Sequence, residues 1–177
     1  MIKAQKDKSI FPYTIALIGF MGCGKSTVAR RLHERYGIKV VEMDDVIEQK
    51  EGKTISKIFE EEGEEYFRQL ETDLLLSLQE ETVIISCGGG VPMRDENVKA
   101  MKASGKIVFL DATPQTVYER VKNDHSRPLL EGKKTVEYIE ELMKKRMDRY
   151  KAVADLMIQV DGKDCDAICD ELMERLA

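Results

Sequence analysis

The sequence has no long hydrophobic run, which limits where the protein is expected to work. No stretch approaches the about 18 consecutive apolar residues of a membrane-spanning helix, and the N-terminal segment "MIKAQKDKSIFPYT" lacks the apolar centre of a secretory signal. We therefore expect a cytoplasmic protein that does not bind a membrane. The chain has 177 residues, of which 42% are hydrophobic, and this is the size of one globular domain over residues 1–177.

Cysteine and histidine are scarce, and their spacing argues against a disulfide or metal framework. The four cysteines are Cys23, Cys87, Cys165 and Cys169. They are irregularly spaced, and a cytosol keeps thiols reduced. Cys165 and Cys169 are one helical turn apart, but neither histidine of the chain is near them, so we expect no zinc site. The net charge of -5 argues against a broad nucleic-acid surface, and an anionic ligand must therefore be bound by local arginines, lysines and backbone amides.

Short apolar runs alternate with helical patterns along the chain. The candidate strands are Tyr13 to Ile18, Lys39 to Met43, Val83 to Cys87, Ile107 to Leu110 and Leu156 to Val160. Most of them are apolar at consecutive positions, as expected when both faces of a parallel sheet are covered. Helical patterns such as residues 25–36 and 135–152 lie between them. This alternation predicts an α/β fold with a parallel sheet flanked by helices.

Two segments interrupt the alternation. Residues 44–79 show polar helical stretches broken at Gly52 and Gly63 and no strand pattern, which predicts an inserted helical subdomain. Residues 123–134, "NDHSRPLLEGKK", combine a proline, a glycine and mixed charges. Such a composition is typical of a mobile surface loop.

The segment "GFMGCGKST", residues 19–27, fits the phosphate-binding pattern G-x-x-x-x-G-K-[ST], a match that arises by chance about once in a hundred such chains or less. A candidate strand leads into it and a helical pattern leads out, as the pattern requires. The loop amides would surround the phosphates of a nucleoside triphosphate, while Lys25 reaches the terminal phosphates and Ser26 binds Mg²⁺. The predicted nucleotide-binding residues of the loop are Gly22, Cys23, Gly24, Lys25, Ser26 and Thr27. An ordinary glycine-rich turn with an exposed lysine is the alternative.

Acidic residues follow two of the candidate strands, where ligands of open α/β sheets bind. Glu42 and Asp44 follow the second strand, in a position to orient Mg²⁺ or to accept a proton from an acceptor hydroxyl. The alternative is that Asp44 or Asp45 only caps the next helix. Asp111 follows the fourth strand, where capping of a helix that begins near Thr113 is at least as well supported as chemistry.

Three consecutive glycines, Gly88, Gly89 and Gly90, follow the third candidate strand. Glycine loses much conformational freedom on folding, so such a run indicates either a turn with positive φ or the close approach of a ligand to bare main chain. Beside a phosphate loop these residues can donate amide hydrogen bonds to an acceptor molecule. Side chains at these positions would block its approach.

Five ordered motifs, covering the chain from about Tyr13 to its end, are together similar to those of one enzyme family. They are "GFMGCGKST", "EMDDVIEQKEGKTISKIFEEEGEEYFRQLE", "SCGGGV", "SRPLL" and "KKRMDRY". In these motifs the chain resembles the shikimate kinases. The resemblance implies a P-loop kinase fold with a five-stranded parallel sheet, a substrate-binding insertion at residues 44–79 and a lid at residues 123–134. It also implies transfer of the γ-phosphoryl group of MgATP to the 3-hydroxyl of shikimate, a step toward chorismate and the aromatic amino acids.

The resemblance assigns roles to individual residues. Asp44 matches the aspartate that holds the ring hydroxyls, and Arg68 and Arg146 match the pair that binds the shikimate carboxylate. Gly88, Gly89 and Gly90 match the glycines whose amides meet the substrate. Arg127 matches the lid arginine that reaches the transferring phosphate, and Arg120 resembles an arginine that lies against the adenine. The predicted catalytic residues are Lys25, Asp44 and Arg127. Guanidinium groups suit both a carboxylate and the charge that develops on a transferred phosphoryl group.

Simpler interpretations of the arginines remain open. Arg68 is at helical spacing from Glu64 and Glu71, and such surface pairs contribute only a few tenths of a kcal/mol. Arg146 and Arg149 share one helix face, which is also typical of a solvated basic stripe. We expect a monomer, because no contiguous apolar stripe stands out.

Glu42 departs from the family pattern, which usually shows Asp-x-Asp after the second strand. The predicted metal ligands are Ser26 and Glu42, but a glutamate is one methylene longer and would place its carboxylate differently. A gluconate-type sugar-acid kinase and a regulatory module without transfer activity are the competing functions. The glycine run and the spacing of Arg68 and Arg146 argue against the first, and only Glu42 supports the second.

Overall fold

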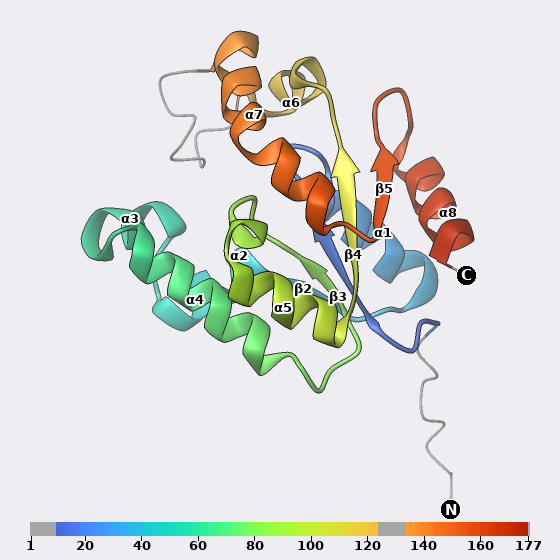
Figure 1. Cartoon of the computed structure of the whole chain (residues 1–177), viewed down its shortest axis with the longest axis horizontal. Helices are drawn as coiled ribbons and strands as arrows, with labels where there is room; N and C mark the ends of the chain where they lie inside the picture. Colours follow the sequence, from blue (N-terminus) through green and yellow to red (C-terminus); the bar gives the residue numbers. More distant parts are fainter. Residues whose placement is uncertain (1–9, 124–133, 177) are drawn as a thin grey trace, which may run out of the picture.

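A five-stranded parallel sheet forms the centre of the molecule (Figure 1). The computed structural model describes residues 10–123 and 134–176. The strands are β1 (Thr14–Ile18), β2 (Val40–Glu42), β3 (Ile84–Ser86), β4 (Gly105–Asp111) and β5 (Leu156–Gln159). Their order in the sheet is β2-β3-β1-β4-β5, and every pairing is parallel. The predicted fold class and the five candidate strands are therefore confirmed.

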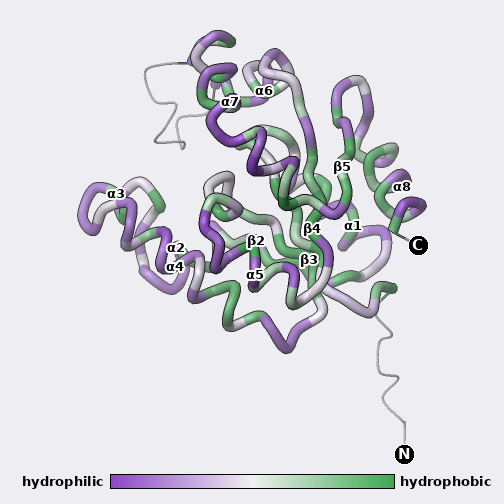
Figure 2. Tube along the Cα trace, in the orientation of Figure 1, coloured by the Kyte–Doolittle hydropathy of each residue, from purple (hydrophilic) through white to green (hydrophobic). Residues whose placement is uncertain are grey.

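Helices cover both faces of the sheet, with α5 and α7 in front of it and α1 behind it in Figure 1. The helices of the described residues are α1 (Lys25–Tyr36), α2 (Met43–Glu51), α3 (Ile55–Glu62), α4 (Glu64–Ser77), α5 (Asp95–Ser104), α6 (Pro114–Val121), α7 (Val136–Val153) and α8 (Cys165–Leu176), with a short 3-10 helix, η1 (Val91–Met93). Figure 2 shows hydrophobic strands at the centre and hydrophilic segments on peripheral helices such as α3. The core therefore lies between the sheet and its two helical layers.

Strand β1 lies at the middle of the sheet and is buried along its whole length. Its Ile15 is in register with Ile84 of β3 on one side and with Lys106 of β4 on the other. Because neighbouring strands flank it and helices cover both faces, no face of β1 meets water, which explains its unbroken apolar sequence. The loop that follows β1 consequently begins at the centre of the sheet edge.

Residues 44–79 form three helices, as their polar helical pattern predicted. Helix α2 ends at Gly52, which has a φ of 68°, and Gly63, with a φ of 88°, separates α3 from α4. Both values lie in the left-handed region that favours glycine. In Figure 1, α3 extends away from the sheet, beyond the β2 edge.

Two capping interpretations of the sequence are wrong. Helix α2 starts directly after β2, so that Glu42 is its N-cap, and the Glu42 side chain makes no capping hydrogen bond. Asp44 and Asp45 lie in the first turn, too late to cap it. The N-cap of α6 is Thr113, whose side chain accepts a hydrogen bond from a backbone amide in the first turn. Asp111 instead pairs with a glutamine side chain of β5.

Most of the predicted lid, including Arg127, lies outside the described residues. After this gap, Thr135 caps α7 through a hydrogen bond from the backbone amide of Tyr138, which agrees with the predicted helix at residues 135–152. Within residues 10–123 and 134–176, no helix combines the length and the apolar composition that a membrane span requires.

Candidate active site

The loop between β1 and α1 has a backbone shape that only glycine adopts readily. Gly22 and Gly24 have φ values of 80° and 101°, and Gly24 is the N-cap of α1. A Cβ atom on Gly22 would lie 2.7 Å from the side chain of Val121, and one on Gly24 would lie 2.7 Å from that of Arg120. The loop therefore presents bare main chain at a helix N-terminus, an arrangement that binds phosphate.

Lys25 is buried at the start of α1, where its ammonium group lies against the loop. Its Nζ donates to the carbonyl oxygens of Gly19 at 2.8 Å and Phe20 at 3.1 Å. These bonds reduce the cost of burying the charge. No ion pair between described residues involves Lys25. The positive charge is therefore not neutralised by a carboxylate of this part of the chain, and it can interact with an anionic ligand.

A cavity of about 500 Å³ opens over the phosphate loop. One wall is the loop itself with Lys25 and Ser26, and another includes Arg120 of α6. Nη1 of Arg120 donates to the carbonyl of Gly22 at 3.3 Å, which holds its guanidinium group beside the loop. Cys165 of α8 also lines the cavity.

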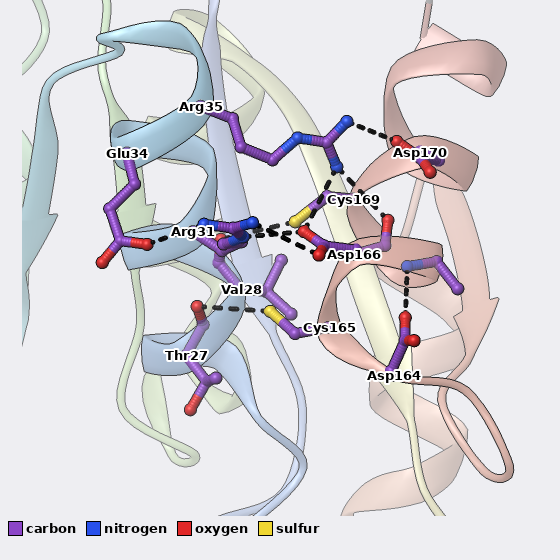
Figure 3. Close-up of polar contacts among 11 residues, drawn as sticks. Thr27, Val28, Arg31, Glu34, Arg35, Asp164, Cys165, Asp166, Cys169 and Asp170 are labelled. Atoms are coloured by element: carbon purple, nitrogen blue, oxygen red, sulfur yellow. Dashed lines mark hydrogen bonds and ion pairs between the residues drawn. The ribbon is translucent and has the colours of Figure 1, made fainter.

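Helix α8 is held against α1 by polar contacts (Figure 3). Arg31 of α1 donates to Asp166 at 2.7 Å, and Arg35 donates to Asp170 at 2.6 Å. The thiol of Cys165 lies 3.6 Å from a carbonyl oxygen of α1. Exposed ion pairs contribute only about 0–1 kcal/mol each, so their main effect is to fix the two helices relative to each other. Through them, α8 forms a side of the cavity.

Three oxygen-bearing side chains meet at the edge of this cavity. Oγ of Ser26 donates to Oε2 of Glu42 at 2.9 Å and lies 3.4 Å from Oγ of Ser86. Glu42 and Ser86 are register partners on β2 and β3, so their side chains lie close together at the end of the two strands. Burial raises the pKa of Glu42, although hydrogen bonds from the two serines lower it. Hydroxyl and carboxylate oxygens are ligands that Mg²⁺ prefers, and this set fits such an ion.

A second cavity, of about 420 Å³, adjoins the first. The residues that line it include Asp44, Arg68, Gly88, Gly89, Gly90 and Arg146. Both cavities are lined by Met21, Asp44, Gly88 and Gly89. The structure therefore brings the six predicted substrate-binding residues together beside the phosphate loop, although their roles in binding stay predictions.

The three glycines of this cavity are explained by close packing. A Cβ atom on Gly88 would lie 2.7 Å from Glu71, one on Gly89 would lie 2.9 Å from Arg146, and one on Gly90 would lie 2.5 Å from Arg68. None of the three glycines has a positive φ, so a special backbone conformation is not the reason. The hydrogen bonds between described residues leave their amide N–H groups unused.

Arg68 makes both of the helical ion pairs that its spacing suggested. It donates to Glu71 at 2.8 Å and to Glu64 at 3.2 Å. Glu71 is completely buried, and its second oxygen, Oε2, has no hydrogen-bond partner within the described residues. Burial raises the pKa of Glu71 to about 7, although the positive charges of Arg68 and Arg146 lower it. The ion pair therefore orients Arg68 along the cavity wall and does not exclude it from a role there.

Glu71 predicts a pH dependence of stability that a glutamine would remove. Its pKa rises from 4.5 to about 7 on folding, so the folded state holds this proton more tightly, and stability is lost as pH rises between these values. We expect the free energy of unfolding of Glu71→Gln to exceed that of the parent protein. The difference should be less than about 1 kcal/mol at pH 5 and on the order of 3 kcal/mol at pH 8. Urea denaturation at both pH values measures the difference.

Glu64→Gln is the matched control, because it removes the same charge from an exposed partner of the same arginine. An advantage of Glu71→Gln that is equal at pH 5 and pH 8 would contradict the prediction, since Glu71 would then be ionised over the whole range.

Arg146 and Arg149, which the sequence placed on one basic helix face, have different surroundings. Arg149 donates to the carbonyl of Pro92 at 2.7 Å and pairs with Asp95 at 2.6 Å. The guanidinium of Arg146 lies 6.0 Å from the ring centre of Phe20, and among the described residues it forms no ion pair. A half-buried arginine without a carboxylate partner in this part of the chain suits an anionic ligand.

Sequence reasoning missed three residues at this site. Ser86 directly precedes the glycine run at the end of β3, a position that the strand-end rule could have identified. Glu71 was considered only as an ion-pair partner of Arg68. Tyr150, four residues after Arg146, ends the motif "KKRMDRY" but was given no role, and only the contact of its hydroxyl with Gly89 distinguishes it.

Comparisons with other proteins agree with this architecture. The model of the shikimate kinase family matches residues 21–177. A shikimate kinase of Persephonella marina is 44% identical over 163 residues, which cover 92% of this chain and 98% of the relative. A shikimate kinase of Dehalococcoides mccartyi is 39% identical and covers 92% of each chain.

Solved structures show the same relationship. The shikimate kinase from Acinetobacter baumannii in complex with shikimate superimposes with a TM-score of 0.87 at 32% identity, covering 93% of this chain and 92% of that chain. A gluconokinase from Sinorhizobium meliloti has a TM-score of 0.61 at 19% identity, covering 94% and 92%, and shows only that the fold is shared. The family model spans most of the chain and the relatives cover it nearly completely, so this protein belongs to the shikimate kinase family.

Proposed function

We propose that the protein transfers the γ-phosphoryl group of ATP to the 3-hydroxyl of shikimate and releases ADP. One observation carries the proposal. A cavity with a phosphate-binding loop and an unneutralised lysine meets, at Gly88 and Gly89, a cavity with two arginines and an aspartate. The first cavity suits a nucleoside triphosphate, and the second suits a small anion that carries hydroxyl groups.

On the donor side, the loop amides and Lys25 bind the phosphates of ATP, and Arg120 lies against the adenine. As the phosphoryl group is transferred, negative charge spreads over its equatorial oxygens. Lys25 stabilises this charge because it is already held in place and needs little rearrangement. Arg127, from the lid, supplies a second positive charge when the lid closes, and closure excludes water that would otherwise hydrolyse ATP.

On the acceptor side, Arg68 and Arg146 bind the shikimate carboxylate. Asp44 orients the ring hydroxyls and accepts the proton of the attacking hydroxyl. The amides of the glycine run donate hydrogen bonds to the substrate, which lies against bare main chain. Glu71 keeps Arg68 in place through its short ion pair.

Ser26 and Glu42 would hold Mg²⁺, with Ser86 beside them. The ion, when bound, neutralises charge on the phosphates during transfer. Glutamate in place of the usual aspartate reaches far enough to accept a hydrogen bond from Ser26, so its extra length does not remove it from the ligand set. We also propose that the chain acts as one monomeric domain, with residues 44–79 as the acceptor-binding insertion and residues 123–134 as the lid.

A coupled assay of ADP release tests the function. With ATP and Mg²⁺, release is expected only when shikimate is present, and mass spectrometry of the product should show one added phosphate. Gluconate and a nucleoside monophosphate serve as alternative acceptors. Equal release with either of them would contradict the proposed acceptor, and absence of any phosphorylated product would favour the regulatory module.

A further inference from the structure

Helix α7 contacts the loop that follows β3 at several points. Arg149 donates to the carbonyl of Pro92, and one turn earlier Arg146 lies beside Gly89. The shortest of these hydrogen bonds comes from Tyr150, whose hydroxyl donates to the carbonyl oxygen of Gly89 at 2.6 Å, compared with 2.7 Å for the bond from Arg149. One helix thus fixes the main chain on which the two cavities meet.

Tyr150 contacts this loop from the protein core and not from the cavities. It is 0% exposed, and its ring packs on Phe109 with ring centres 5.2 Å apart. Burial raises the pKa of Tyr150 to about 12, so the hydroxyl stays a hydrogen-bond donor over the usual pH range. Tyr150 lines neither cavity, although Gly89 and Arg146 do. Its influence on a ligand must therefore pass through the residues that it contacts.

The bond from Tyr150 constrains a donor group of the cavity. The carbonyl of Gly89 and the amide N–H of Gly90 belong to one planar trans peptide and point in opposite directions. Holding the carbonyl toward Tyr150 therefore directs the N–H of Gly90 away from Tyr150. Hydrogen bonds within the described residues do not use this N–H, so it is available to a ligand.

The same hydroxyl lies next to the arginine of the cavity. A Cβ atom added to Gly89 would lie 2.9 Å from Nη1 of Arg146 and 3.5 Å from the hydroxyl oxygen of Tyr150, so both side chains lie against this glycine. The two side chains are one helical turn apart on α7 and flank the same glycine. A tyrosine fixed by the core thus limits the movement of both the peptide and the guanidinium group.

We propose that Tyr150 is a positioning residue for acceptor binding: its buried hydroxyl sets the orientation of the Gly89–Gly90 peptide and supports Arg146. It affects acceptor affinity far more than nucleotide binding, because Gly90 and Arg146 line only the acceptor cavity, whereas Gly89 lines both. The proposal rests on the proposed function only for the identity of the acceptor, because the contacts themselves do not depend on it.

Tyr150→Phe tests the proposal, because it removes only the hydroxyl. We expect the Kd for shikimate to rise by about tenfold in isothermal titration calorimetry, while the KM for ATP stays within about twofold of the parent value. Amide hydrogen exchange in residues 88–93 should become faster, since the peptide loses its anchor. Tyr13→Phe is the matched control: the hydroxyl of Tyr13 also donates to a backbone carbonyl, that of Leu176, away from both cavities.

Each outcome supports or overturns the proposal. A lower Tm of Tyr150→Phe, with an unchanged Kd for shikimate and unchanged amide exchange in residues 88–93, would overturn the proposal. Tyr150 would then contribute only to the stability of the core. Equal losses for shikimate and ATP would also overturn it. If Tyr150→Phe does not fold, Arg149→Met provides a second test, because it removes the neighbouring hydrogen bond to Pro92. We expect it to raise the Kd for shikimate by a smaller factor, and an unchanged Kd would then contradict the proposal.

Shikimate binding by the parent protein distinguishes a failure of this proposal from a failure of the proposed function. A parent protein that does not bind shikimate would refute the proposed acceptor. Faster exchange in Tyr150→Phe would in that case still show that the tyrosine anchors the loop, whereas unchanged exchange would refute the anchor itself.

Discussion

Replacing Lys25 with methionine is expected to lower kcat by roughly 100- to 1,000-fold. Methionine fills a similar volume without a charge, so the change removes the ammonium group and keeps most of the packing of a buried side chain. In the parent protein this group is held by the carbonyls of Gly19 and Phe20, close to where the transferred phosphoryl group would lie. Initial rates of shikimate-dependent ADP release at varied ATP concentrations separate kcat from KM.

Lys39→Met is the control for the loss of a lysine charge. Lys39 is exposed and pairs with Glu81 at 2.8 Å. Its replacement should leave kcat unchanged, and thermal unfolding of both variants shows whether they are folded. A folded Lys25→Met protein that keeps more than about a tenth of the parent kcat would contradict the role given to this lysine.

Arg146→Ala is expected to raise the KM for shikimate by roughly 30- to 1,000-fold, which corresponds to about 2–4 kcal/mol. The guanidinium group lines the acceptor cavity and has no ion-pair partner among the residues described, so its loss removes charge that the substrate carboxylate would otherwise meet. The KM for ATP should change little, because the arginine does not line the nucleotide cavity. Steady-state kinetics with each substrate varied in turn measures both constants.

Lys145→Ala is the matched control, since it removes a positive charge from the adjacent exposed position of the same helix. It should leave both KM values near those of the parent. A large fall in kcat for Arg146→Ala, with an unchanged KM for shikimate, would instead assign Arg146 to the transfer step.

The sequence was sufficient to predict the sheet because its signals are local. Buried strands such as β1 are apolar without interruption, and the phosphate loop needs glycine at defined positions, so both can be recognised within a short window. The capping interpretations failed because they depend on one residue. Helix α2 starts immediately after β2, and a shift of two positions was enough to remove Asp44 from the cap.

The site was harder to predict where it depends on contacts between distant segments. Arg68 and Arg146 were found through family motifs, but the burial of Glu71 against Gly88 follows only from the packing of α4 on the glycine run. Ser86 reaches Ser26 because β3 pairs with β2 in one particular register. Tyr150 resembles any core aromatic until its hydroxyl is seen to meet Gly89, 61 positions earlier in the chain.

The closeness of the two glycine loops has a practical consequence for ligand design. A Cβ on Gly89 would lie only 3.7 Å from the carbonyl oxygen of Gly19, and Gly89 lines both the nucleotide cavity and the acceptor cavity, so the two cavities are close together. A synthetic inhibitor that occupies both cavities therefore needs only a short bridge. With a short bridge, binding of one group of the inhibitor would hold the other group at a high effective concentration beside its cavity.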